Sequence, residues 1–102
     1  MNLNLNNITF VIVTFKSEKI VHECINSLPV NSNKIVIENS KNIELKKKLE
    51  SKYDNIEVII NENLGMGASN NIGIKKSKTK YAFIINPDTK FNITLLKAFM
   101  WP

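Results

Sequence analysis

Residues 8–13 read Ile-Thr-Phe-Val-Ile-Val, a nearly continuous apolar run that ends at the polar Thr14. Three later runs have the same character, at Lys34–Ile37, Ile56–Ile60 and Tyr81–Ile85. Continuous hydrophobicity with many β-branched and aromatic residues is typical of strands that are buried on both faces. The four runs therefore predict the strands of one buried sheet.

Segments with apolar residues at helical spacing lie between these runs. The first helix is expected to begin after Ser17, which is predicted to cap it because serine is a favourable N-cap residue. This helix is expected to stop at Pro29. The second has its apolar residues between Ile43 and Tyr53, with a run of lysines on the solvated face. Both helices follow a strand and lead into the next one.

A third helix is expected over about Gly67–Lys76, with Ala68, Ile72 and Ile74 turned toward the sheet, and a last helix is expected to begin at Asn92. The order β-α-β-α-β-α-β predicts an α/β fold with right-handed crossovers. We expect a mainly parallel four-stranded sheet with helices on both faces, in one domain that spans residues 1–102.

Composition excludes several classes of protein. Cys24 is the only cysteine, so an internal disulfide is excluded and a buried, inert thiol is expected. The net charge of +5 comes from lysine without any arginine, which disfavours a nucleic-acid partner because base recognition relies on arginine. No run is long enough to span a bilayer and no secretory signal is present. A cytoplasmic location is predicted, with weak peripheral association at the inner membrane face as an alternative.

Polar residues follow each of the four apolar runs. Ligands of parallel α/β sheets bind beyond the carboxyl ends of the strands, so these residues are candidates for a binding site, although loops at this edge are commonly polar in any case. They are Thr14 after the first run, Glu38, Asn39 and Ser40 after the second, Asn61, Glu62 and Asn63 after the third, and Asn86 and Asp88 after the fourth.

Two of these loops contain residues with special chemistry. The segment Gly65-Met66-Gly67 is not a dinucleotide-binding fingerprint, because it lacks the third glycine and follows the third predicted strand and not the first. No phosphate-binding Gly-Lys-Ser/Thr sequence is present either. These two glycines fit a simple turn equally well.

In Asn86-Pro87-Asp88-Thr89, Asp88 emerges where a phosphate-bound cation could sit, and an ordinary turn aspartate is the alternative.

Three blocks of the sequence together resemble the family 2 glycosyltransferases, which have the GT-A fold. The blocks are residues 11–28 with Val-Ile-Val-Thr-Phe-Lys-Ser at their start, residues 35–40, and residues 61–74 paired with residues 81–88. The last pairing, which ends in Asn-Pro-Asp, is similar to the branch that contains rhamnosyltransferases and other enzymes of cell-surface polysaccharides. The resemblance covers roughly residues 8–96.

The resemblance implies a site for a UDP- or dTDP-linked sugar and a divalent cation, Mg²⁺ or Mn²⁺. Asp88 matches the last residue of the family's Asp-x-Asp motif and is the predicted metal ligand, while Asn86 replaces the first Asp. Glu38 stands where the family usually has Asp, and Lys16 where it usually has Asn. The implied nucleotide-sugar-binding residues are Val13, Thr14, Phe15, Glu38, Asn39, Gly65, Asn71, Asn86 and Asp88.

The implied activity is inverting transfer of a hexose or deoxyhexose to an acceptor hydroxyl. The general base and the acceptor-binding region of the family lie well after the metal motif, so we expect them beyond Pro102, in a missing segment or a second chain. A non-catalytic remnant or interaction module with half of the GT-A fold is the alternative. An unrelated flavodoxin-like domain is disfavoured because the acidic cluster and phosphate loop of such domains are missing.

Overall fold

The computed structural model describes residues 5–62 and 65–92. Strands and helices alternate here as predicted, after a short 3₁₀ turn, η1 (Leu5–Asn7). None of the helices in these two ranges is long and apolar enough to cross a membrane. The elements are β1 (Ile8–Thr14), α1 (Val21–Ser27), β2 (Asn33–Glu38), α2 (Ile43–Lys52), β3 (Ile56–Ile60), α3 (Met66–Lys76) and β4 (Tyr81–Ile85).

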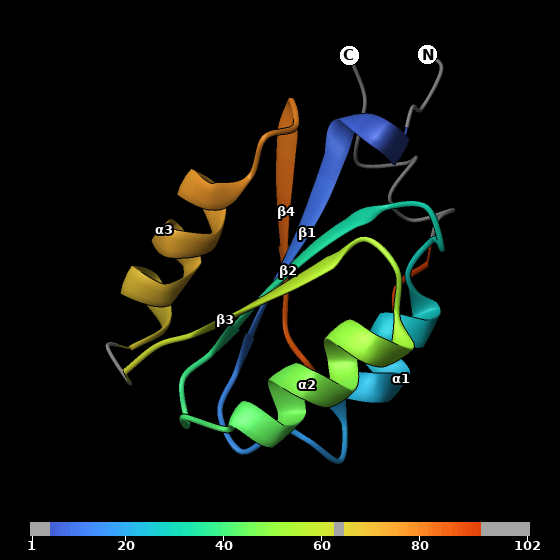
Figure 1. Ribbon diagram of the computed structural model, residues 1–102. Helices are drawn as coiled ribbons and strands as arrows, with labels where there is room; N and C mark the ends of the chain where they lie inside the picture. Colours follow the sequence, from blue (N-terminus) through green and yellow to red (C-terminus); the bar gives the residue numbers. More distant parts are fainter. Residues whose placement is uncertain (1–4, 63–64, 93–102) are drawn as a thin grey trace.

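The four strands form one sheet in the order β3-β2-β1-β4, and every neighbouring pair is parallel. β1 lies inside the sheet, with Val13 opposite Ile37 of β2 and Ile12 opposite Ile85 of β4. The predicted α/β fold is therefore confirmed, and its sheet is parallel throughout these strands. All four strands end at the same edge, which we call the carboxyl edge, and the opposite end is the amino edge (Figure 1).

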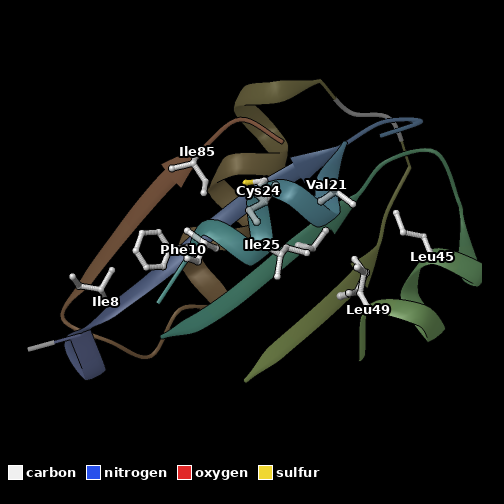
Figure 2. Packing of buried hydrophobic residues seen from close by; sticks show 12 residues of the cluster. Ile8, Phe10, Val21, Cys24, Ile25, Leu45, Leu49 and Ile85 are labelled. Atoms are coloured by element: carbon white, nitrogen blue, oxygen red, sulfur yellow. The ribbon is translucent and has the colours of Figure 1, made fainter. Parts of the chain in front are cut away.

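Helices cover both faces of the sheet, with α1 and α2 on one side and α3 on the other (Figure 1). The larger core cluster lies under α1 and α2, where Phe10 of β1 contacts Cys24 and Ile25 of α1 and the leucines of α2 extend the cluster (Figure 2). The smaller cluster contains Val13 and Ile37 under α3. The alternation of side chains along each strand supplies both cores, which explains the continuous hydrophobicity of β1.

Two expectations about the helices were wrong. α1 begins at Val21, and its N-cap residue Ile20 makes no side-chain capping bond. Ser17 does not cap it because the Ser17 hydroxyl bonds to the backbone N–H and C=O of Phe15, two residues earlier. Hydroxyl side chains compete with helix formation through such local bonds.

The buried face of α3 also differs from the prediction. Ala68 and Ile74 are exposed, whereas Ser69, Ile72 and Gly73 face the sheet. The last predicted helix, from Asn92 onward, lies outside the described residues, apart from Asn92 itself, which is not helical.

Gly73 allows α3 to pack closely on the sheet. A methyl group at this position would overlap with the side chain of Val11, which is fully buried in β1. We expect Gly73→Ala to destabilise the fold by about 1–3 kcal/mol, the usual range for an overpacked core. Urea unfolding of the purified variant measures this free energy.

Gly67→Ala is the matched control, because a methyl group there would meet no atom within 4 Å apart from the adjacent residues and the backbone of its own helix. Alanine has a higher helix propensity than glycine by about 1 kcal/mol, so this variant should be as stable as the parent or more stable. Equal destabilisation of the two variants would contradict close packing at Gly73.

Candidate nucleotide-sugar site at the carboxyl edge

The register of the strands brings their polar ends together. Thr14 and Glu38 are direct partners at the ends of β1 and β2, and Asn86 directly follows β4 on the other side of β1. A pocket of about 410 Å³ opens at this edge. This volume lies within the range of small-molecule sites. Its lining comes from the β1–α1 loop, the start of the β2–α2 loop, the residue before α3 and the turn after β4. The lining residues are Val13, Phe15, Ser17, Ile20, Asn39, Gly65, Asn86, Pro87 and Asp88.

Glu38 lies beneath this edge and is not part of the pocket wall. Its side chain is fully buried. One carboxylate oxygen accepts hydrogen bonds from the hydroxyls of Thr14 (3.1 Å) and Ser40 (2.7 Å). The other accepts from the backbone N–H of Ser40 (2.9 Å) and of Asn42 (2.8 Å). A buried carboxylate needs such bonds to offset its lost hydration, and here they fix the loop between β2 and α2.

Asn39 connects this loop to its neighbours. Its backbone N–H donates to the carbonyl of Thr14 at 2.8 Å, which continues the pairing of β1 and β2 by one residue. Its side-chain amide donates to the hydroxyl of Ser69 in α3 at 2.6 Å, and its amide oxygen accepts from the side chain of Asn61 at 3.4 Å. Asn39 is buried, so it lines the pocket from below as a fixed group.

Gly65 stands where the chain turns from β3 into α3. Its φ of 89° lies in the left-handed region that residues with a Cβ rarely adopt. Gly65 is the N-cap residue of α3, and as a glycine it has no side chain that could cap the helix. The first N–H groups of a helix have no partner within the helix, and here the residue before that helix start lines the pocket.

The turn that carries Asp88 is held against α1. Within the turn, the N–H of Thr89 donates to the carbonyl of Asn86 at 2.9 Å. The same carbonyl accepts a 3.6 Å bond from the Cys24 thiol, and the N–H of Phe91 donates to the Ser27 hydroxyl at 2.8 Å. Both ends of the segment are thus attached to one face of α1.

Aromatic packing adds a third attachment. The Phe91 ring meets the Phe10 ring edge-on with centroids 4.9 Å apart, and it also meets the Phe83 ring at 6.4 Å. Phe10 is fully buried in β1. The segment after β4 is therefore fixed to the core on both sides of Asp88, while the Asp88 side chain itself stays exposed.

The Cys24 thiol is a permanent hydrogen-bond donor in this arrangement. Burial raises the pKa of the Cys24 thiol to about 11, and the negative charge of Asp88 adds to the increase. At neutral pH the sulfur keeps its proton and can donate to Asn86. The predicted inert, buried cysteine is thus also one of the groups that hold the turn.

The pocket can hold a cation only together with a ligand. Among the described residues, no three His, Cys, Asp or Glu side chains gather in a metal-binding group. Of the described residues that line the pocket, Asp88 is the one carboxylate, and Asn86 adds an amide. One carboxylate does not make an all-protein cage, but it fits a Mg²⁺-type ion that takes its other ligands from phosphates and water.

The structure brings most of the predicted site residues to one place. Val13, Phe15, Asn39, Gly65, Asn86 and Asp88 line the pocket, and Thr14 and Glu38 are buried behind it. Asn71 is exposed on α3 and does not line the pocket. Asn71 lies two residues after Ser69, which faces the sheet. Two residues correspond to a rotation of about 200° around the helix axis, so Asn71 lies on the side of α3 away from the sheet.

Three lining residues were not among the predicted site residues: Ser17, Ile20 and Pro87. Each is adjacent to a predicted residue or lies in the same loop, which was the signal that could have identified them. The contribution of Cys24 and Ser27 to the turn had no such signal, because they lie more than sixty positions from their partners, Asn86 and Phe91.

A pocket at the carboxyl edge of a parallel α/β sheet is the place where ligands bind in domains of this architecture. The family model described as glycosyl transferase family 2 matches residues 9–100, so the chain belongs to glycosyl transferase family 2. No curated protein sequence gives a match.

Among solved structures, the crystal structure of S. aureus TarS 1-349 is similar over 90% of this chain, with a TM-score of 0.72 and 20% sequence identity. This likeness establishes the GT-A type of fold. The chain covers 30% of that structure.

The bonds of Glu38 predict how the loop responds to substitution. Glu38→Ala leaves the half-buried backbone N–H groups of Ser40 and Asn42 without an acceptor, and we expect a loss of roughly 2–4 kcal/mol in the free energy of unfolding. In Glu38→Gln the amide oxygen can accept from the same N–H groups, while the amide N–H group donates to the hydroxyls of Thr14 and Ser40. That variant should lose less than about 1 kcal/mol.

Urea unfolding of the two variants at neutral pH gives both values. If Glu38→Gln is as unstable as Glu38→Ala, the loop depends on the negative charge and the hydrogen-bond account is incorrect.

Proposed function

We propose that this chain forms the nucleotide-sugar-binding part of a glycosyltransferase that uses a divalent cation, Mg²⁺ or Mn²⁺. The observation that carries the proposal is the pocket at the carboxyl edge, whose lining combines Asp88 and Asn86 with Phe15 and Gly65. Family membership supports sugar transfer as the reaction. The resemblance of residues 61–74 and 81–88 to rhamnosyltransferases and related enzymes supports a UDP- or dTDP-linked hexose or deoxyhexose as donor and cell-surface polysaccharide synthesis as the process.

The groups of the pocket divide into an apolar side and a polar side. Phe15 is 48% exposed and lies next to Val13 and Ile20 in the wall. An exposed ring with apolar neighbours suits the flat face of a nucleobase. Asn39, fixed by its bond to Ser69, can offer its remaining hydrogen-bonding capacity to a ribose or base.

The polar side suits a diphosphate. The start of α3 after Gly65 presents backbone N–H groups and the positive end of a helix dipole, both favourable for an anion. Asp88 and Asn86 supply a carboxylate and an amide oxygen beside it. When bound, a divalent cation would neutralise the charge that grows on the departing nucleoside diphosphate.

The chain's own residues hold this arrangement in place. Cys24, Ser27 and Phe91 fix the turn on both sides of Asp88, so the carboxylate needs little ordering when a ligand arrives. Inverting transfer additionally needs a base to deprotonate the acceptor hydroxyl. Asp88 is the one carboxylate that the described residues supply to the pocket, and it is assigned to the cation, so we propose that the base comes from outside these residues.

Isothermal titration calorimetry with UDP tests the proposal in the presence and in the absence of Mn²⁺. We expect binding that depends on the metal and that falls by at least about tenfold in Asp88→Asn, since even outer partners of a metal site contribute that much. Glu62→Gln is the matched control, because Glu62 is an exposed carboxylate after β3 that does not line the pocket. No metal-dependent binding of UDP or dTDP, or equal losses in both variants, would refute the proposal.

A second candidate is a non-catalytic module that keeps this half of the fold. Among the described residues, the pocket wall holds a single carboxylate, which favours this candidate. Transfer of a radiolabelled sugar by the purified chain would exclude this alternative. Metal-dependent binding of a nucleoside diphosphate without turnover would support it.

A further inference from the structure

The densest group of positive charges lies at the amino edge, away from the pocket. Residues 75–80 read Lys-Lys-Ser-Lys-Thr-Lys and form the last turn of α3 and the loop into β4. All four lysines are exposed. This loop lies at the opposite end of the sheet from the β1–α1 loop (Figure 1). We call the surface of residues 74–81 the lysine edge.

Helix capping explains only part of this charge. Lys75 and Lys76 lie in the last turn of α3, where cations favourably meet the negative end of the helix dipole. Lys78 and Lys80 follow the C-cap residue Ser77 and have no such role. Within residues 5–62 and 65–92, no carboxylate forms an ion pair with any of the four.

A hollow of about 320 Å³ lies beside these lysines, between the end of α3 and the amino ends of β2 and β3. Lys76 and Lys78 stand in its wall together with the carboxylate of Glu57. Lys34 also lines it, but its ammonium group already donates to the carbonyls of Val30 and Ser32. The cationic groups with donors to spare are thus the exposed lysines.

Apolar side chains flank the charges. Ile74 is 43% exposed and Tyr81 is 45% exposed. The Lys80 ammonium lies 5.5 Å from the centre of the Tyr81 ring. Tyrosine is enriched at the interface between lipid and water, and lysine can bury its aliphatic stem there while its charge stays in the headgroup layer.

We infer that the lysine edge docks the chain on a bilayer that contains anionic phospholipids. Lysine clusters gain energy from the negative potential of such a surface, and Ile74 and Tyr81 add apolar contact with the headgroup region. The chain contains no arginine, the residue that nucleic-acid-binding proteins use most for bidentate contacts with guanine, and this disfavours a nucleic acid as the partner. In this orientation the pocket at the carboxyl edge opens away from the lipid.

Co-sedimentation of the full chain with vesicles tests the inference. We expect binding to vesicles that contain phosphatidylglycerol, no binding to phosphatidylcholine alone, and loss of binding at high salt. Each lysine near an anionic surface contributes about a fivefold factor. The triple variant Lys75→Gln, Lys76→Gln, Lys78→Gln should therefore bind about a hundredfold more weakly.

The matched control replaces Lys47, Lys48 and Lys52, three exposed lysines of α2, by glutamine. Each triple variant lowers the net charge by three, from +5 to +2, so a difference between them reports position and not total charge. Ile74→Ser should weaken binding, and Ile43→Ser, at an isoleucine of α2 that is even more exposed (56% against 43%), should not.

Three outcomes would overturn the inference. They are no binding to anionic vesicles, equal losses in the two triple variants, and preferential binding to duplex DNA or RNA at the same salt concentration. Circular dichroism of every variant ensures that each result reports binding by a folded chain.

Discussion

The parallel pairing of β1 on both of its sides is the interaction on which the rest of the structure depends. β2 and β4 flank this strand, and their pairing sets Thr14 beside Glu38 and brings Asn86 to the same edge. Because strand direction is uniform, every polar strand end lies at one edge and every return loop at the other. The pocket and the lysine edge are thus separated by the length of the sheet.

The fold could be predicted well because its signals are local. Four apolar runs and the helical spacing between them determine the element order, and connections between parallel strands are right-handed by rule. The start of α1 could not be predicted, since it depends on whether the Ser17 hydroxyl bonds forward to a helix or back to Phe15. The face of α3 was misjudged because Gly73 and Ser69, small residues, form the contact with the sheet in place of Ala68 and Ile74.

The candidate site was predictable as a set of strand ends and less so residue by residue. The positions of Asn39, Asn86 and Asp88 directly after apolar runs predicted correctly that they lie at the carboxyl edge. Whether a side chain there faces the pocket or the core depends on strand register and on hydrogen-bond partners, which the sequence does not reveal. Glu38 illustrates this. Its direct partner across the sheet is Thr14, and its oxygens are fully engaged by Thr14 and the loop that follows. In this chain the family's acidic position after the second strand holds a loop together, and the pocket beside it is lined by Asn39.

We propose that the pocket at the carboxyl edge receives a nucleoside diphosphate. A ¹H–¹⁵N NMR titration of the full chain with UDP and Mg²⁺ tests this most directly, because it reports the bound position for every amide at once. We expect shifts at Phe15, Asn39, Gly65 and Asp88, which line the pocket, and unchanged signals at Thr9 and Thr79, which line the hollow at the amino edge. Shifts that gather at Thr9 and Thr79, or no shifts at saturating ligand, would contradict it.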